Sequence, residues 1–228
     1  MKQSDIYFVG FLALFFCPFF ISKEVYDTYI TLVVQHAIIM SFLKFAILAT
    51  LGEVIGLRVT TGVYHVKGFG VLPRALFWGL TGVGIKIAFT IFANGAPVFI
   101  DHYVVTLPDD VLRGGLNGYK VLTAFAISTS MNVMFAPVFM IMHKISDLHI
   151  EETGGTVPGY FKKLDLAGLM RKINWDVMWK FVFGKTIPFF WIPAHTITFL
   201  LPPQHQVLFA AILGVVLGVI MAISSLKN

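Results

Sequence analysis

The chain has 228 residues, of which 57% are apolar and only 13% are charged, and its mean hydropathy is +0.81. A soluble domain carries about a quarter charged residues, so this composition excludes a soluble globular protein and predicts an all-α bundle of membrane-spanning helices. The net charge of +5 does not indicate nucleic-acid binding, because the basic residues lie mainly between apolar stretches. Cys17 is the only cysteine, which excludes an intramolecular disulfide and multi-cysteine metal sites.

Six apolar stretches are long enough to be read as spanning helices of one domain covering residues 1–228. In chain order they are 6–22, 30–55, 71–100, 116–142, 177–201 and 207–226. The first stretch is close to the minimum spanning length and contains Pro18, so a signal peptide is the alternative reading. We favour a retained helix, because the residues that follow offer no small-residue cleavage site.

The lysines and arginines test this count independently. With six spans, one side of the membrane holds Lys2, Arg58, Lys67, Arg74, Lys144, Lys162, Lys163, Arg171, Lys172 and Lys227, and the other holds only Lys23 and Arg113. Loops rich in lysine and arginine stay in the cytoplasm. We therefore predict that both termini are cytoplasmic.

The longest polar segment, 143–174, is predicted to be a cytoplasmic loop that contains an amphipathic helix. Phe161, Leu164, Ala167 and Ile173 fall on one side of such a helix, while the basic residues between them can reach outward. We expect this helix to lie in the interface and to hold the loop on anionic lipid. Recognition of a protein partner is the alternative.

Lysines within the predicted spans are the main functional signal. A lysine that faces lipid at mid-depth costs at least about 2.5 kcal/mol, so Lys44 and Lys86 should face protein or water. At about 100° per residue, Lys86 and Thr90 share a helical face with small residues, which suits a pore-facing side. The alternative is that these lysines snorkel or pair inside the bundle, with Glu53 as an acidic partner.

The last two predicted spans add polar and small residues. Lys180, His195 and Thr198 fit one broad face of the fifth span if its prolines leave the helical register intact. We therefore predict a polar path lined by Lys44, Lys86, Thr90, Lys180, His195 and Thr198. In the sixth span, Gly214 and Gly218 form a Gly-x-x-x-Gly pair, which we assign to close helix packing.

The other motifs of the sequence predict neither a metal site nor a catalytic site. The acidic and histidine side chains of 101–110 could hold a divalent cation, but solvated polar residues on an outer loop are the more common case. No pairing of a nucleophile with a base, or of two carboxylates, occurs at useful spacing. We therefore predict no enzyme activity, no metal and no cofactor.

The C-terminal quarter carries a recognisable pattern. Trp175 and Asp176 are followed by Trp191, then Phe199 and Pro203, and then by one last apolar helix. This pattern resembles the signature of the Mpv-seventeen and peroxisomal-membrane-protein-twenty-two family, which reads Trp-Pro-x-x-Gln-x-x-Asn-Phe and then a proline and an arginine. This chain departs from it at four positions, where it has Ile192, His195, Thr198 and Val207.

The resemblance implies a small helical membrane protein of a diverged, bacterial type. It implies a location in the bacterial inner membrane, or in a peroxisomal or mitochondrial inner membrane in a eukaryote. Members of the family are thought to form weakly selective channels. We therefore expect a channel or small-solute permeability protein, with the lipid bilayer and a homo-oligomer as the partners to consider. The competing hypothesis is a structural membrane protein that binds lipid or a membrane partner without transport.

Overall fold

The computed structural model describes residues 2–226, and this part of the chain is helical throughout, with no strand. Its contacts fall into two compact units, Met1–Met40 and Ser41–Asn228, where the sequence predicts one domain. The helix α4 (Ala37–Thr61) carries the chain from the first unit into the second. An all-α membrane bundle, as predicted, is the architecture of the second unit.

The first unit contains three helices, α1 (Gln3–Phe16), α2 (Pro18–Ile21) and α3 (Lys23–Gln35). Together α1 and α2 form the candidate span Gln3–Ile21, none of which is buried, as expected for a segment that faces lipid. The predicted second span, 30–55, starts too early, because α3 ends before His36 and α4 begins at Ala37. The break falls at the polar pair Gln35 and His36, which the predicted span includes between two apolar runs.

The second unit continues with α5 (Val71–Tyr103), α6 (Gly118–Met134) and α7 (Ala136–Glu152). A bend of 47° separates α6 from α7. Pro137, near the start of α7, lacks a backbone N–H, and proline is a common cause of such kinks. The predicted loop 143–174 is therefore wrong at its start, because α7 stays helical to Glu152.

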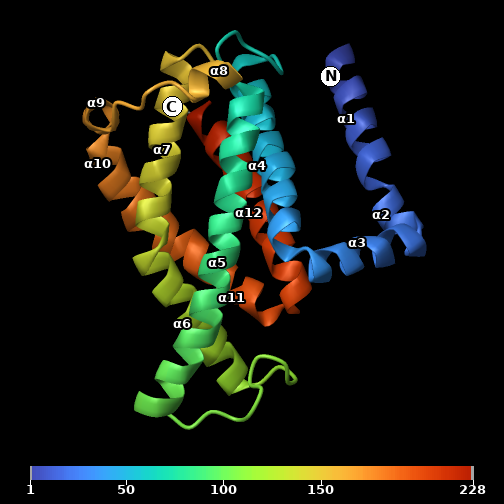
Figure 1. Ribbon diagram of the computed structural model, residues 1–228, viewed down its shortest axis with the longest axis vertical. Helices are drawn as coiled ribbons and strands as arrows, with labels where there is room; N and C mark the ends of the chain where they lie inside the picture. The colour runs from blue at the N-terminus through green and yellow to red at the C-terminus, as the bar shows by residue number, and fades with distance from the viewer. Residues whose placement is uncertain (1, 227–228) are drawn as a thin grey trace. The chain divides into compact units, whose positions relative to one another are not determined.

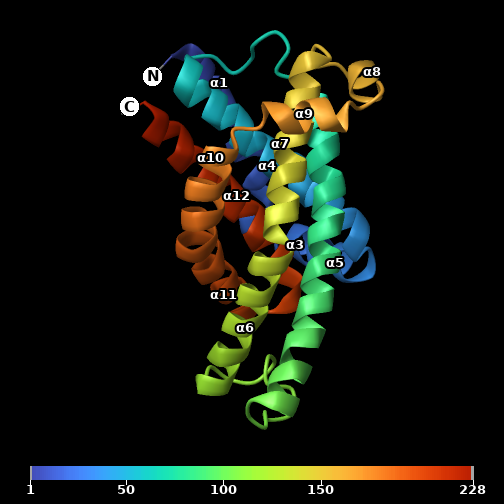
Figure 2. The same ribbon diagram turned by 90° about the vertical axis from the view of Figure 1, so that its left-hand side faces the viewer.

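Three short helices follow α7, and three longer ones complete the described part of the chain. They are α8 (Val157–Tyr160), α9 (Leu166–Lys172), α10 (Trp175–Val177), η1 (Met178–Trp191), α11 (Ile192–Leu200) and α12 (Pro203–Ser225). The η1 segment is a π-helix, in which hydrogen bonds run from residue i to i+5, and the Ile192 N–H accordingly donates to the Ile187 carbonyl. Figures 1 and 2 show α11 beside α6, with α10 nearer the end of the bundle that holds α8 and α9.

Within residues 2–226, four helical segments are long and apolar enough to cross a membrane, and the bent pair α6–α7 would make a fifth if it forms one span. The four are Gln3–Ile21, Ala37–Thr61, Val71–Tyr103 and Pro203–Ser225. The predicted span 177–201 is helical along its length but is not among them, because it is divided between η1 and α11. A sixth crossing by this segment therefore stays a prediction.

The predicted amphipathic helix is shorter than expected and is held by protein on one side. Leu169 and Ile173 are buried against Ile145 of α7 and Met178 of η1. In contrast, Phe161 is 71% exposed and Leu164 is also exposed. The face predicted from the periodicity is therefore wrong in part, because the helix begins only at Leu166 and the residues before it do not follow helical spacing.

Small residues allow α4 and α12 to approach closely. A Cβ atom on Gly52 would lie 2.9 Å from the Cα of Val215, and one on Gly218 would lie 3.8 Å from the Gly52 carbonyl oxygen. Gly218 thus lies next to the backbone of α4, as the predicted packing role requires. Gly214 differs, because no heavy atom lies within 4 Å of the position that its Cβ would take.

A second close approach holds the start of α5 against the end of α7. Gly70 precedes α5 with φ = 73°, and a Cβ at this position would lie 2.6 Å from Ile150 Cγ2 and 2.9 Å from the Cα of Gly155. Both the positive φ and the lack of space require glycine. This contact brings the first turn of α5 beside the last turns of α7.

We predict that Gly52→Ala destabilises the protein by about 1–3 kcal/mol, because the added methyl group would force α4 away from the backbone of α12. The measurement is unfolding of the purified protein in detergent. Gly214→Ala is the matched control and should leave stability unchanged or slightly raised. Equal stability of the two variants would contradict this packing.

We also predict that residues 110 and 163 face opposite sides of the membrane. Asp110 lies in the loop between α5 and α6, and Lys163 lies between α8 and α9, and Figures 1 and 2 show these loops at opposite ends of the bundle. The measurement is labelling of single cysteines in a Cys17→Ser background with an impermeant thiol reagent. Labelling of both positions from the same side would refute the predicted topology.

Candidate functional site

Arg74, in the first turns of α5, is the centre of a buried charged network. Its side chain is only 7% exposed, and its Nη1 donates to Glu53 Oε2 of α4 at 2.9 Å and to Asp147 Oδ1 of α7. Its Nη2 lies 3.2 Å from Glu151 Oε1, and its Nε donates to the Phe69 carbonyl at 2.7 Å. The guanidinium thereby connects three helices through charge-assisted hydrogen bonds.

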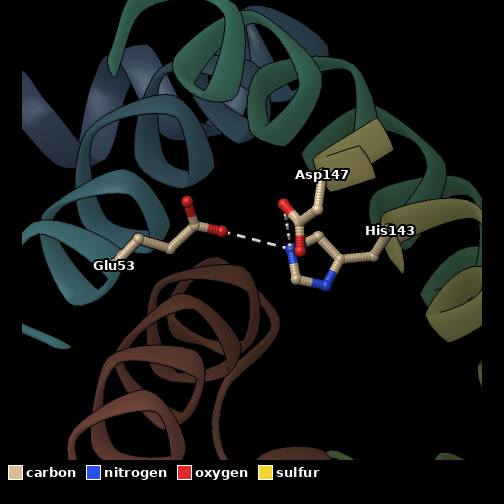
Figure 3. Close-up of side chains that lie close together, drawn as sticks. All are labelled: Glu53, His143 and Asp147. Carbon is tan, nitrogen blue, oxygen red and sulfur yellow. Dashed lines mark hydrogen bonds and ion pairs between the residues drawn. The ribbon is translucent and has the colours of Figure 1, made fainter. Parts of the chain in front are cut away.

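Glu53 brings two further side chains into this network. Its Oε1 accepts a hydrogen bond from Trp78 Nε1 at 2.9 Å and lies 3.1 Å from His143 Nε2. Because an ionised carboxylate can only accept, the imidazole is the donor in this contact. Figure 3 shows Glu53 and His143 pointing toward each other from α4 and α7, with Asp147 beside the ring. The indole of Trp78 packs on the imidazole, with ring centroids 4.6 Å apart.

The positions of Glu53, His143 and Asp147 also meet the spacing of a metal site. Each offers one ligand atom, and these atoms lie within 4.8 Å of one another. One histidine and two carboxylates are a ligand set that a divalent transition metal accepts. However, Asp147 Oδ1 already accepts from Arg74, and Glu53 Oε1 already accepts from Trp78. The guanidinium thus provides the positive charge that these carboxylates need, and the arrangement favours an ion-paired network.

A cavity of about 370 Å³ lies inside the second unit, beside this network. Glu53, Trp78, His143 and Asp147 line it, whereas Arg74 does not. Along α5 the lining extends from Trp78 to Phe89, which is about 16 Å at 1.5 Å per residue. The cavity therefore extends over roughly half of a hydrocarbon layer about 30 Å thick.

The other end of the cavity is formed by α11 and its neighbours. His195 is 7% exposed, lines the cavity, and is stacked on Trp191 with centroids 5.3 Å apart. Its Nδ1 lies 3.3 Å from Thr198 Oγ1, and that hydroxyl donates to the Ala194 carbonyl at 3.0 Å. Because the Thr198 proton is already used, Nδ1 must be the donor to Oγ1. The Nε2 atom of His195 is then an acceptor, and it forms no hydrogen bond within residues 2–226.

The predicted interior position of His195 and Thr198 is confirmed, and Thr198 is fully buried. The four other residues of the predicted path do not line the cavity. Lys44 is buried in α4, and Lys86 is partly buried in α5. Thr90 is exposed and donates to the Lys86 carbonyl of its own helix at 2.9 Å.

Lys180 lies on the outside of the molecule. Its ammonium group is 2.6 Å from Asp176 Oδ1, and both side chains are exposed. The pairing of these two residues follows from their i, i+4 spacing, but their predicted position on the same face as His195 is wrong. The π-helical winding of η1 lies between them, so the register that an α-helix would keep from Lys180 to His195 is lost.

The residues of the family-like pattern have mainly packing and capping positions. Trp175 Nε1 donates to the Met170 carbonyl at 3.1 Å, which holds the end of α9. Phe199 is 1% exposed and packs against Phe89 with centroids 4.9 Å apart. Pro203 is the first residue of α12, where its missing N–H is not needed. Of this pattern, only Trp191 lines the cavity.

Sequence reasoning missed the residues that form the charged network. The alternative reading of the sequence pairs Glu53 with a lysine, but its partner in the structure is Arg74, which the sequence places only among the cytoplasmic charges. His143, Asp147 and Glu151 follow one another at four-residue spacing and therefore share a face of α7. This spacing is visible in the sequence, but the predicted loop that begins at residue 143 leaves no helix on which it could be recognised.

Comparison with protein-family models, with curated proteins and with solved structures gives no match to this chain.

We predict that Arg74→Met destabilises the protein by about 3–5 kcal/mol, because it leaves buried carboxylates without their counter-charge. Lys180→Met, which removes an exposed partner of Asp176, should cost less than about 1 kcal/mol. Unfolding of both variants in the same detergent measures the difference. Similar losses would mean that the network around Arg74 does not hold the bundle together.

Proposed function

We propose that this integral membrane protein is a weakly selective channel or small-solute permeability protein whose path includes the cavity between Glu53 and His195. The observation that carries the proposal is the length of this cavity along α5, about 16 Å, with polar groups at both of its ends. A cavity that only fitted one lipid chain would not require an acid–histidine pair at one end and a buried histidine at the other.

The charged side chains that line the cavity differ from those that the sequence predicts along the path. Lys144 is the lysine of the lining, and it is exposed. The partly buried charges of the lining are the carboxylates of Glu53 and Asp147, with His143 between them. Rings of acidic side chains favour cations, whereas lysine and arginine favour anions. The proposed path therefore favours cations, and Lys86 does not line it.

The experiment is solute flux into liposomes that contain the purified protein, measured by stopped-flow light scattering with small neutral solutes such as glycerol. We predict that Gly214→Leu reduces the flux to that of protein-free liposomes. Gly214 lines the cavity and has no heavy atom within 4 Å of its Cβ position, so the longer side chain should fill the cavity without forcing helices apart.

Gly84→Leu is the matched control, because Gly84 also has free space at its Cβ position but does not line the cavity. It should conduct like the unmodified protein, and so should Lys86→Met. If the unmodified protein shows no flux of any solute, the protein is a structural membrane protein that holds lipid or a partner. If Gly214→Leu conducts normally, solutes do not pass through this cavity.

A further inference from the structure

Charge is unbalanced at the network end of the cavity. Three carboxylates, those of Glu53, Asp147 and Glu151, surround the single guanidinium of Arg74. Even when His143 carries a proton, the carboxylates outnumber the cations in this network. Arg74 does not line the cavity, whereas Glu53 and Asp147 do. A solute in the cavity therefore meets the acidic side of the network, and Lys144, the lysine that the described lining contains, is exposed.

The opposite end of the cavity also carries polar groups. His195 is more than nine-tenths buried, lines the cavity, and has Nδ1 engaged with Thr198. Its Nε2 is an acceptor without a hydrogen bond within the described part of the chain. The Trp191 indole N–H, on the ring stacked on His195, is a buried donor with no hydrogen-bond partner within the described part of the chain. Buried polar atoms in folded proteins are almost always paired, so this end of the cavity indicates a ligand or water that can both donate and accept.

Aromatic rings form much of the wall between the two ends. Phe45, Trp78, Phe89, Phe139 and Trp191 all line the cavity. The faces of aromatic rings attract organic cations, and the same rings bury an apolar body. The cavity volume of about 370 Å³ is at the lower end of the range of small-molecule sites, which limits the ligand to a small organic molecule.

From these three observations we infer that the cavity binds a small organic cation, an amine with an apolar or aromatic body, whose ammonium group donates to Glu53 and Asp147. This inference rests on the proposed function, since it assigns a substrate class to the same cavity. An ammonium group can add its hydrogen bonds to carboxylates that keep their contacts with Arg74 and Trp78. A bare divalent metal would need the same oxygen atoms that these two residues already occupy.

The test compares three probes that share one body and differ in charge: phenylpropylammonium, phenylpropanol and phenylpropanoate. Their binding to the unmodified protein in detergent micelles is measured by calorimetry, with empty micelles as the blank. The ammonium probe should bind about tenfold or more tightly than the alcohol, and the carboxylate probe should bind weakest. A carboxylate or alcohol that binds as tightly as the ammonium probe overturns the inference.

Glu53→Gln should reduce the preference for the ammonium probe to near that for the alcohol, and Asp147→Asn should reduce it as well. The matched control is Asp176→Asn, which neutralises an exposed carboxylate outside the cavity and should leave the preference intact. If neither cavity variant folds, the three-probe series on the unmodified protein still decides. Stabilisation by Zn²⁺ or Mn²⁺ that is lost in His143→Gln, without a preference for the ammonium probe, would make this a metal site.

The two proposals can fail separately. Flux of neutral solutes without any preference for the ammonium probe would leave the permeability function standing and refute the substrate class. Tight ammonium binding without flux would keep the cation site and refute the permeability function.

Discussion

The ion pairs of Arg74 are the interaction on which the second unit depends. A guanidinium buried among helices is stable only if its donors find acceptors, and here the acceptors come from α4 and α7 as well as from the backbone beside α5. The three helices must therefore keep one relative position at this level. The orientation of His143 and Trp78, and with it the polar end of the cavity, follows from that position.

The close glycine contacts complement this network. Gly70 lets the start of α5 touch the turn after α7, so that Arg74 reaches Glu151 as well as Asp147. Gly52, one residue before Glu53, lets α4 lie directly on the backbone of α12. While Gly52 contacts α12, the next residue, Glu53, reaches Arg74 of α5 and His143 of α7. The bend between α6 and α7 occurs at the same depth as the cavity lining from Met131 to Met140.

Some features of the fold and of the site can be predicted from sequence patterns, and others cannot. The start of α5 at Val71, the close packing at Gly218 and the burial of His195 and Thr198 follow from hydropathy and from the cost of polar groups in lipid. The ion pairs of Arg74 do not follow, because each of them joins two helices whose mutual distance no sequence pattern encodes. Lys180 was misplaced because nothing in its surroundings reveals that the following turns are π-helical. The end of α7 was missed because His143 and Asp147 read as polar loop residues until their burial is known.

Of the three carboxylates that pair with Arg74, Glu53 is the nearest in sequence, and this has a consequence for the way the chain enters a membrane. Glu53 and Arg74 are 21 residues apart, on consecutive helices, so they can neutralise each other as soon as α4 and α5 have left the ribosome as a hairpin. Asp147 arrives 73 residues after Arg74 and finds a guanidinium that is already in place. The acidic face of α7 then enters a bilayer that holds its counter-charge, where alone it would cost several kcal/mol. Biogenesis of the bundle therefore has a direction, with the α4–α5 hairpin as the template on which α7 is inserted.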